Sequence, residues 1–507
     1  MSCKKLIMVI FAGLLLSGNS LWAKDIYFNV KSFGARGNGK KDDAASIQRA
    51  INAAAEAGGV VYFPKGTYLL ASFKVTNHYL ENYILKLQSG IKIMGEGEKS
   101  VVKLGNNLFS GKETSANAHL FFGLNVSDIS FSDFVIDLNG SRNPVPEGVL
   151  KNYAAIFVKN GSGVSVDRMV MKNTSGRTMM NIMGKGKGLR VENSCFFNGG
   201  TYPGNGKTNP YQDDFSFVYS EWDSTLVRNN LMKQEDVSIA LTGYCGGLEL
   251  HGSHSVAMQN QFVGCWPAIY ISSTMGKNME GVVVSNNKIT QCVTGISFWL
   301  MDTMKDVTIS QNVIDLVAPT GSRHKNIFVW GIVMPNGNVD NYDRNLANNA
   351  PVVNLRITNN TIQADSMGNV SGGISVHSLQ NSVIDSNLFS GFNYSGINVA
   401  GSKWGIDSLV IDKNRFVNFR QNTHPQMVGG YFVVTDTYSP KHKDPPGFKN
   451  ILISDNDISD VLTPLPDGKG KIPSGFIALP PGQMKGIQLK NNLLNKALTE
   501  FKKVVTN

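Results

Sequence analysis

The sequence predicts an all-β protein folded as a right-handed parallel β-helix, with one helix covering the N-terminal end of the coil. Three observations lead to this prediction: a strand-and-asparagine motif that recurs along most of the chain, 52 glycines among 507 residues, and one helix-like pattern near the start. Abundant glycine with few helix-length apolar patterns indicates many turns and short strands. The recurring motif decides between the all-β folds, because it sets a repeat length.

The motif is a short run of alternating apolar residues that ends in asparagine and a further apolar residue. It occurs at Asn193, Asn230, Asn260, Asn287, Asn312, Asn360, Asn387, Asn414, Asn456 and Asn492. The shortest spacings, 25 to 27 residues, define the repeat, and the longer ones are this repeat with a loop inserted. Each repeat holds two short β-branched runs and no helix, which excludes helical repeat architectures and leaves a parallel solenoid.

The recurring asparagine has an expected role in such a coil. Asparagine tolerates left-handed backbone geometry at a turn, and stacked asparagine side chains hydrogen-bond to one another along a column. A chance surface asparagine would not recur in register. We therefore expect a column of stacked side chains at one turn of the coil, formed by Asn287, Asn312, Asn360, Asn387 and Asn414.

A different pattern precedes the repeats. Two aspartates stand before an amphipathic stretch that begins at Ser46, and a Gly-Gly pair at 58–59 closes it, so one helix is expected here. A strand is expected directly after the glycines. Residues 24–507 are expected to form a single domain, in which 24–70 are the N-terminal segment that carries the capping helix.

The first residues resemble an export signal. Lys4 and Lys5 precede an apolar run that ends at Leu16, and Ala23 offers a cleavage site. The run is shorter than the ~20 residues of a membrane-spanning helix, and no later segment is suited to span a membrane. Residues 1–23 are therefore expected to be a signal peptide, and the mature protein to be secreted or periplasmic.

The formal net charge of +10 suits an acidic partner. A uronate-containing or sulfated glycan fits a secreted protein better than nucleic acid does, and an evenly solvated basic surface is the alternative. Four widely spaced cysteines follow the signal region, at Cys195, Cys245, Cys265 and Cys292. Their spacing argues against a zinc site and leaves two interpretations open, paired disulfides or buried thiols.

One face of the coil is expected to gather polar and aromatic side chains. Aligning the strands puts aliphatic residues such as Leu248 and Leu250 inside and their neighbours outside. Successive coils lie ~4.8 Å apart, so the outward residues line up. They are Glu249, His251, Tyr270, Ser272, Ser297, Trp299, Ser375 and His377. Tyr270, Trp299 and His377 are candidate substrate-binding residues, and packing beneath an inserted loop is the alternative for the two aromatic side chains.

Glu249 and His251 are the sharpest candidates for chemistry. They point the same way from one strand, with Cα atoms ~6–7 Å apart. A carboxylate and an imidazole at that distance can act as general acid and base. A slip of one residue would bury both polar groups at high cost, so the outward phase is well determined. An exposed ion pair is the alternative interpretation.

Further acidic residues surround Asn230 and supply a candidate second catalytic group. They include two adjacent pairs, and comprise Asp213, Asp214, Glu221, Asp223, Glu235 and Asp236. Neighbouring carboxylates raise the pKa of one member, which suits a general acid. The catalytic candidates among them are Asp213, Asp214, Glu235 and Asp236.

Two loop insertions carry basic and aromatic residues. Arg323 and Lys325, in the insertion at 315–356, are candidate ligands of an anionic glycan, and the insertion at 420–449 has a similar composition. Each such residue is equally consistent with a solvated loop. No calcium-binding cluster is recognisable, so no metal or cofactor is expected unless the protein is a lyase, for which Ca²⁺ is the expected ion.

Three short motifs carry a resemblance to a known family. They are Phe-Gly-Ala-Arg at 33–36 with aspartates at 42–43, Ile-Gln at 47–48 with Ala-Ile at 50–51, and Gly-Gly-Val-Val at 58–61 with Phe-Pro at 63–64. This segment closely resembles the start of the pectate lyase superfamily, which includes family 28-like glycoside hydrolases, polysaccharide lyases and tailspike-type enzymes. The resemblance implies that the helix caps the open N-terminal end of the coil, where strand edges would otherwise be unpaired.

The resemblance also bears on catalysis. Family 28 hydrolases use a set of aspartates that includes an adjacent pair, which implies such a role for the pairs at 213–214 and 235–236. The chain lacks the Asn-Thr-Asp, Gly-His-Gly and Arg-Ile-Lys motifs of that family. One fold hosts many chemistries, so the fold alone does not select the reaction.

The sequence therefore favours a secreted glycoside hydrolase that acts on an acidic polysaccharide. Glu249 and an acidic residue from 213–236 would be its acid and base, and family analogy favours inversion, for which the two carboxyl groups lie ~6.5–9.5 Å apart. A polysaccharide lyase is the alternative, with His251 or a lysine as base and a cation to neutralise the uronate. A non-catalytic glycan-binding β-helix is the third interpretation.

Overall fold

The structure is a computed structural model of the chain. It describes residues 26–76, 78, 81–108, 118–144, 152–199, 216–235, 245–274, 276–318, 329–334, 350–364, 371–392, 395–400, 404–418, 431–436, 448–460, 475–478 and 486–494. The expected signal peptide and the candidate residues Asp213, Asp214, Asp236, Arg323 and Lys325 lie outside these ranges. The chain divides into two compact units, Met1–Glu235 and Asp236–Asn507. Whether residues 24–507 behave as one domain stays a prediction.

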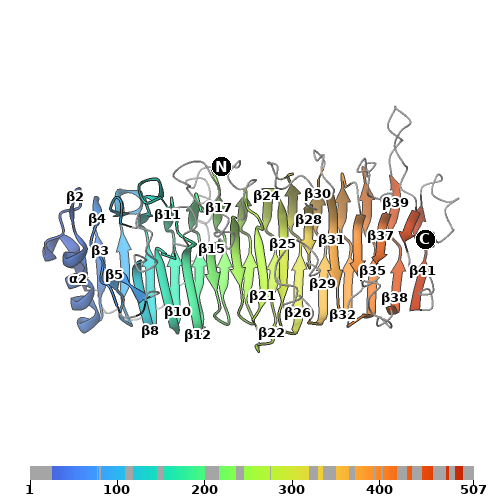
Figure 1. The fold of residues 1–507 in the computed structure, drawn as a ribbon, viewed down its shortest axis with the longest axis horizontal. Coiled ribbons are helices and arrows are strands. Elements are labelled where there is room, and N and C mark those ends of the chain that lie inside the picture. The colour runs from blue at the N-terminus through green and yellow to red at the C-terminus, as the bar shows by residue number, and fades with distance from the viewer. Residues whose placement is uncertain are drawn as a thin grey trace, which may run out of the picture. The chain divides into compact units, whose positions relative to one another are not determined.

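Unit 1 is a parallel coil in which each turn contributes a strand to each of three faces (Figure 1). The first face contains β5 (Tyr83–Lys86), the N-terminal halves of β8 (His119–Ser132) and β10 (Ile156–Asp167), β12 (Thr178–Lys187) and β15 (Ser216–Ser220). The second contains β1 (Tyr27–Asn29), β3 (Val60–Phe63), β6 (Lys92–Gly95), the C-terminal halves of β8 and β10, β13 (Arg190–Glu192) and β16 (Leu226–Arg228).

The third face of unit 1 forms a separate sheet. It contains β2 (Asn38–Asp42), β4 (Gly66–Leu70), β7 (Ser100–Leu104), β9 (Val135–Asp137), β11 (Val170–Lys172), β14 (Cys195–Phe197) and β17 (Leu231–Lys233). Three short 3-10 helices join these strands: η2 (Val30–Phe33), η4 (Gly97–Lys99) and η6 (Gly140–Arg142).

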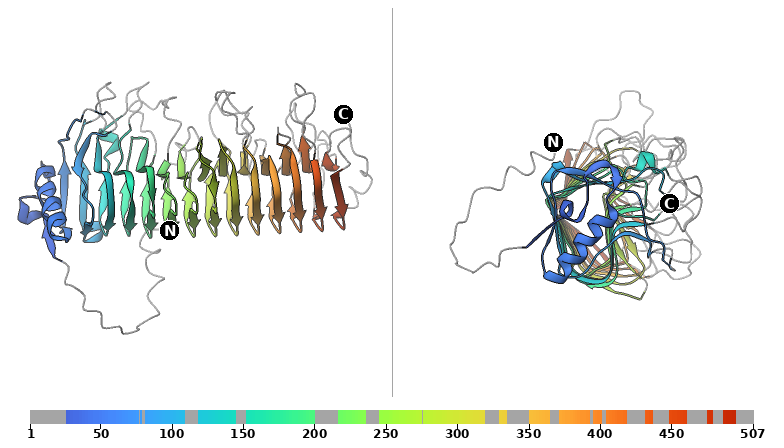
Figure 2. Two further views of the ribbon diagram at one scale, coloured as in Figure 1. Left: turned by 90° about the horizontal axis from the view of Figure 1, so that it is seen from below. Right: turned by 90° about the vertical axis from the view of Figure 1, so that its left-hand side faces the viewer.

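The expected capping helix is α2 (Ala44–Ala57), which lies at the N-terminal end of unit 1 (Figure 2). Its apolar side, which includes Ile47 and Ile51, is fully buried and contacts β1, β3 and β5. Asp42 caps the first turn, because its Oδ1 accepts the backbone N–H of Ala44 at 3.0 Å. The helix ends at Gly58, whose φ of 68° is the left-handed geometry that glycine adopts without strain. The predicted N-terminal helix is confirmed.

Unit 2 repeats the same three-faced arrangement. Its first face contains β18 (Gly246–Leu250), β21 (Ile269–Ser273), β25 (Thr294–Leu300), β28 (Val329–Val333), β31 (Ser371–His377), β34 (Ser395–Ala400), β37 (Tyr431–Asp436) and β40 (Gly475–Ala478). The second contains β19 (Val256–Met258), β22 (Met279–Glu280), β23 (Val283–Ser285), β26 (Met304–Ser310), β29 (Val352–Thr358), β32 (Leu379–Asp385), β35 (Ile406–Asp412), β38 (Phe448–Ser454) and β41 (Ile487–Lys490).

The third face of unit 2 contains β20 (Gln261–Val263), β24 (Lys288–Cys292), β27 (Val313–Leu316), β30 (Thr361–Gln363), β33 (Leu388–Ser390), β36 (Arg415–Val417), β39 (Asp457–Asp460) and β42 (Leu493–Leu494). In both units the neighbouring strands of each face run parallel, and the inward aliphatic side chains form the core. The predicted parallel β-helix is confirmed. Among the residues that the structure describes, no helix is long and apolar enough to cross a membrane.

The predicted asparagine column is present in unit 2. The Nδ2 of Asn287 donates to Oδ1 of Asn312 at 3.0 Å, and Asn312 donates in the same way to Asn360 at 2.9 Å. Each amide also donates to a carbonyl of the preceding coil, as Asn312 does to Val284 at 3.0 Å. The contacts continue from coil to coil through Asn260, Asn287, Asn312, Asn360, Asn387, Asn414, Asn456 and Asn492.

Two details of the asparagine prediction are wrong. The left-handed residue is the one before the column asparagine, such as Asn286 at φ 55° or Gln311 at φ 57°. The column position itself is chosen for its side-chain hydrogen bonds. In unit 1 the sequence motif placed Asn193 in the column, but Asn193 is a left-handed residue. The backbone N–H of its neighbour Ser194 donates to Oδ1 of Asn230 at 2.9 Å, so Ser194 occupies the column position.

For three of the cysteines, the structure decides between disulfides and buried thiols. Cys245, Cys265 and Cys292 are buried thiols in unit 2. The backbone N–H of Cys265 donates to Sγ of Cys292 at 3.3 Å. Burial raises the pKa of the Cys245 thiol to about 12, which keeps it protonated and unreactive. These three side chains therefore act as small apolar core residues.

Candidate functional site

The first face of unit 2 presents the predicted row of outward residues. Parallel pairing aligns, coil by coil, Glu249, Tyr270, Ser297, Val333, Ser375 and Asn398. Two residues further along each strand, the pairing sets Ser272 opposite Trp299 and His377 opposite Ala400. The predicted alignment of these strands is confirmed, since every aligned pair belongs to neighbouring coils.

Glu249 and His251 form a direct pair at the end of β18. Nε2 of His251 lies 3.3 Å from Oε2 of Glu249. Leu248 and Leu250 on the same strand are fully buried, as the predicted phase required. The side chains of Glu249 and His251 are 12% and 11% exposed, so the pair is largely shielded from solvent. At this distance the imidazole and the carboxylate can share a hydrogen bond, and the shielding from solvent strengthens their electrostatic interaction.

The aromatic candidates differ in their surroundings. Tyr270 and Trp299 are half-buried on the outer side of β21 and β25. His377 is 1% exposed, and its Nδ1 lies 3.0 Å from the hydroxyl of Ser378. Tyr270 thus lies in the row of Glu249, whereas the side chain of His377 is buried. The roles of all three in substrate binding stay predictions.

Glu235 is the one acidic candidate of the pairs 213–214 and 235–236 that the structure describes. It follows β17 and belongs to a polar column at a turn of unit 1. Its Oε2 accepts from Nδ2 of Asn198 at 2.9 Å, and its backbone N–H donates to Oδ1 of Asn198 at 3.1 Å. Asn198 donates in turn to Asn173 at 3.1 Å. These contacts give Glu235 a structural role at the turn, and a catalytic role beside Glu249 stays a prediction.

Glu235 also borders a cavity on the third face of unit 1. The cavity measures about 430 Å³. Its lining is Glu98, Val101, Val135, Val170, Lys172, Asn173, Phe197, Asn198 and Glu235. Three valines in register form its floor.

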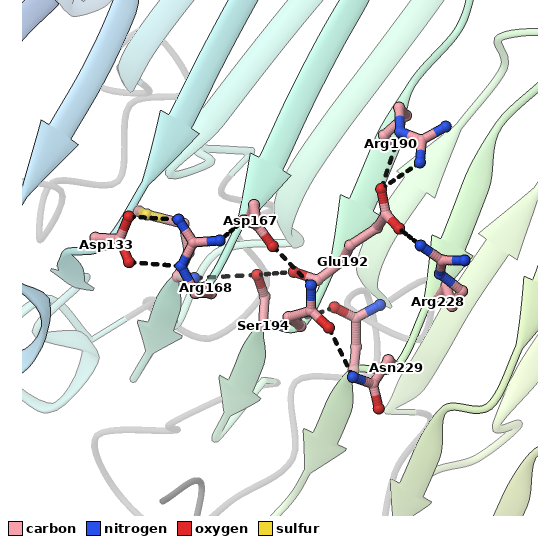
Figure 3. A network of polar contacts seen from close by, with 11 residues as sticks. Asp133, Asp167, Arg168, Arg190, Glu192, Ser194, Arg228 and Asn229 are labelled. Atoms are coloured by element: carbon pink, nitrogen blue, oxygen red, sulfur yellow. Dashed lines mark hydrogen bonds and ion pairs between the residues drawn. The ribbon is translucent and has the colours of Figure 1, made fainter. Parts of the chain in front are cut away.

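Charged side chains also form a network at the turn between the second and third faces of unit 1 (Figure 3). The guanidinium of Arg168 makes two hydrogen bonds to Asp133, at 2.7 and 2.8 Å, and Asp133 raises the pKa of Arg168. The carboxylate of Glu192 forms ion pairs with Arg190 at 2.6 Å and with Arg228 at 2.5 Å. Each charge here faces an opposite charge, so this network stabilises the turn.

The first face of unit 1 carries a group of side chains that sequence reasoning did not assign to a site. The hydroxyl of Tyr219 donates to Oε1 of Glu221 at 2.8 Å, and the N–H of Gly184 donates to Oε2 at 2.5 Å. Asn181 lies opposite Tyr219 in the neighbouring coil. Glu221 stands out in the sequence as an acidic residue. Its contact with Tyr219 could not be predicted, because the short apolar sequence of β15 does not reveal which of its residues point outward.

An aromatic stack adjoins this group. The rings of Tyr83 and Phe122 lie 5.7 Å apart, and those of Phe122 and Phe157 lie 5.5 Å apart, nearly parallel in both cases. His119 stacks on Phe157 at 4.1 Å. Phe157 is directly opposite Asn181 in the register of β10 and β12. On this side of the first face of unit 1, the buried side chains therefore change from aromatic at Phe157 to polar at Asn181 between two neighbouring coils.

In the described part of the chain, no group of three or more histidine, cysteine, aspartate or glutamate side chains is placed to hold a metal ion.

Comparison with known proteins identifies the family. Residues 27–297 match the family described as rhamnogalacturonase A/epimerase, pectate lyase-like. The matched stretch exceeds half of the 507 residues, and this chain belongs to that family. The membership agrees with the resemblance carried by the N-terminal motifs and with the parallel coil.

Three curated relatives match shorter stretches. Plasmin and fibronectin-binding protein A of Streptococcus pneumoniae is 33% identical over 185 residues, 34% of this chain and 24% of that protein. Alginate lyase 7 of Azotobacter vinelandii is 34% identical over 157 residues, 29% and 17% of the two chains. Mannuronan C5-epimerase AlgE1 of Azotobacter vinelandii is 30% identical over 172 residues, 33% and 12% of the two chains. The matches span about a quarter or less of these relatives.

Solved structures share the fold. A tailspike protein of E. coli bacteriophage HK620, in complex with a pentasaccharide, has a TM-score of 0.67 at 16% identity and covers 92% of this chain and 78% of its own. The A-module of mannuronan C-5 epimerase AlgE6 of Azotobacter vinelandii has a TM-score of 0.55 at 16% identity, covering 86% of this chain and 100% of its own. At these identities the likeness establishes the architecture.

Proposed function

We propose that this protein is an enzyme that acts on an acidic, uronate-containing polysaccharide by proton transfer at Glu249 and His251. The observation that carries the proposal is the 3.3 Å contact between the imidazole and the carboxylate on an outward strand. The net charge of +10 favours an anionic substrate. Two relatives are named for alginate and mannuronan, both uronate polymers, which supports the same substrate class.

The reaction that this pair suits best is β-elimination, the alternative raised from the sequence. The Glu249–His251 pair would take the proton from C5 of the uronate, and the electrons of that C–H bond would form the C4–C5 double bond. The C4–O bond would break, and the leaving oxygen would take a proton from an acid. Tyr270, in the same row one coil away, is the candidate acid. Arg323 and Lys325 remain the proposed partners of the uronate carboxylate.

Hydrolysis, the reaction first expected from the sequence, is the second candidate. It would use Glu249 as acid and a carboxylate from 213–236 as base, and the adjacent acidic pairs in that stretch favour it. The described residues supply the carboxylate–imidazole pair directly, whereas the second carboxylate stays a prediction. For this reason we favour elimination over hydrolysis. A purely binding role is the third candidate, favoured by the name of the Streptococcus pneumoniae relative.

The products separate these candidates. Pectate, alginate and sulfated glycans are each incubated with the purified protein, and new reducing ends and ultraviolet absorbance of unsaturated uronates are followed together. Elimination is expected to give both signals on a uronate polymer. Reducing ends without the absorbance would replace elimination by hydrolysis, and neither signal on any polymer would contradict both cleavage reactions.

A further inference from the structure

The last described strands of unit 2 are paired on one side. In the described part of the chain, β41 pairs with β38 and β42 pairs with β39, and no strand pairs with their other edges. Free strand edges invite association with other chains, and proteins usually cover them. The first strands of unit 1 are covered by α2, which contacts β1, β3 and β5. The described residues of unit 2 contain no helix that could do the same.

The core of unit 2 is exposed at β41. Ile487 and Leu489 lie opposite Ile451 and Ile453 of β38. Ile451 is 2% exposed and Ile453 is fully buried, whereas Ile487 is half-buried and Leu489 is 53% exposed. Parallel pairing sets inward residues opposite inward residues, so Ile487 and Leu489 continue the core of the preceding coil. We call this pair the core end.

The chain after β42 has the pattern of an amphipathic helix. Residues 495–507 lie outside the described ranges and read Asn-Lys-Ala-Leu-Thr-Glu-Phe-Lys-Lys-Val-Val-Thr-Asn. Apolar residues recur at helical spacing, at Ala497, Leu498, Phe501, Val504 and Val505. A helix turns ~100° per residue, so these five positions fall within an arc of about 120°, and polar residues fill the remainder.

The start and the length of this segment suit the core end. Asn495 directly follows the last residue of β42 and is a favoured residue type at a helix N-cap. A helix over 496–506 would span ~16 Å, enough to cross the ~10 Å that separate packed β-sheets. A helix this short is marginal in water on its own, so it requires a surface on which to pack its apolar side.

From the exposed core end and the amphipathic segment we infer that residues 496–506 form a helix that docks on the core end, with its apolar side toward Ile487 and Leu489. The occupant is this chain's own segment rather than a second copy, because its attachment to β42 gives it a high effective concentration there. The helix would close the core of unit 2 as α2 closes that of unit 1, and it would shield the free edges of β41 and β42. The inference is independent of the proposed function.

Two leucines give a matched first test in the full-length protein. Leu489 and Leu493 are 53% and 58% exposed, but Leu493 lies beside the inward Leu494 and points away from the core. Leu489→Asp is expected to lower the apparent Tm by about 3 °C, because it places a charge beneath the docked helix. Leu493→Asp is expected to leave it unchanged. An unchanged Tm for Leu489→Asp would mean that Leu489 stays solvated, and would overturn the inference.

Hydrogen exchange gives the second test. Phe501→Asp removes the central apolar side chain of the segment, and Thr499→Asp makes the same change of charge on its polar side. The amides of β41 are expected to exchange about tenfold faster in Phe501→Asp, because the cover of their strand is lost. Thr499→Asp is expected to match the wild-type protein. Equal exchange of β41 in Phe501→Asp and the wild type would overturn the inference.

Combining the substitutions identifies the occupant. Leu489→Asp is expected to cause no further fall in Tm in the Phe501→Asp protein, because both changes break one contact. Additive losses would show that the segment does not meet the core end, and would overturn the inference. Exchange of β41 is also measured over a range of protein concentrations. Protection that grows with concentration would assign the core end to a second copy of the chain, and would overturn the inference as well.

Discussion

Asparagine occupies two kinds of place in this molecule. In the column of unit 2, Asn312 donates to Asn360 and Val284 and accepts from Asn287, so its amide is fully used. On the first face of unit 1, Asn181 is equally withdrawn from solvent, yet its Oδ1 has no partner in the described part of the chain. The same side chain is therefore expected to stabilise the coil where its hydrogen bonds are complete and to contribute little where its Oδ1 has none.

The comparison fails most clearly if the asparagine column of unit 2 contributes little to the free energy of unfolding. Asn312→Ala removes four side-chain hydrogen bonds, among them the one that Oδ1 accepts from the backbone N–H of Asn287. The free energy of unfolding is expected to fall by about 3 kcal/mol, measured by denaturant titration. A loss below about 1 kcal/mol would show that the column is a consequence of the coil rather than a cause of its stability.

The opposite sign is expected on the first face of unit 1. Asn181→Leu replaces an amide whose Oδ1 has no partner in the described part of the chain by an apolar side chain of similar size, opposite Phe157 in the neighbouring coil. The free energy of unfolding is expected to rise by about 1 kcal/mol, because an unsatisfied polar group leaves the interior. The same denaturant titration measures it. A loss comparable to that of Asn312→Ala would remove the distinction between the two regions.

A smaller effect concerns pH at the turns of the coil. The hydroxyl of Ser459 donates to Oδ1 of Asp457 at 2.6 Å, and this hydrogen bond lowers the pKa of Asp457. A lowered pKa stabilises the fold above the ordinary carboxyl pKa of about 3.9, and the contribution disappears as the pH falls through the folded-state value. Ser459→Ala is expected to reduce Tm slightly at neutral pH.

Thermal unfolding of Ser459→Ala and the wild-type protein between pH 7 and about pH 2 measures this difference. The two curves should converge at the acid end. On the first face of unit 1, Asn181 has no ionisable side chain, so the stability change of Asn181→Leu should be the same across this range. A pH-independent gap for Ser459→Ala would contradict the role given to its hydrogen bond.

The sequence was sufficient to predict the parallel coil and to predict which residues of each strand face the core. A repeat of 25 to 27 residues and the alternation around Leu248 and Leu250 follow directly from the need to bury one side of each strand. The column was predictable for the same reason. Its exact turn geometry was not, because Asn-Asn pairs such as 286–287 and 359–360 conceal which asparagine takes the left-handed position.

The unpartnered Oδ1 of Asn181 was beyond sequence reasoning. Asn181 lies within Thr-Met-Met-Asn-Ile-Met, an apolar run whose alternation is blurred, so its outward direction is not readable. The one signal was a lone amide inside that run. Whether a buried oxygen has a partner depends on side chains one coil away, which are separated by 25 residues or more in the chain. Such contacts are a property of the stacked coils rather than of any single repeat.

The central claim is that Glu249 and His251 transfer the proton in catalysis, and a pair of matched variants tests it most directly. Glu249→Gln keeps the shape of the largely shielded pair, whereas Glu280→Gln alters an exposed carboxylate–imidazole pair in the same unit, 3.6 Å from His254. Initial rates are measured on the uronate polymer that the wild-type protein degrades. Glu249→Gln is expected to lose about 100-fold or more in kcat with unchanged Tm, and Glu280→Gln to keep full activity. Full activity of Glu249→Gln would contradict the claim.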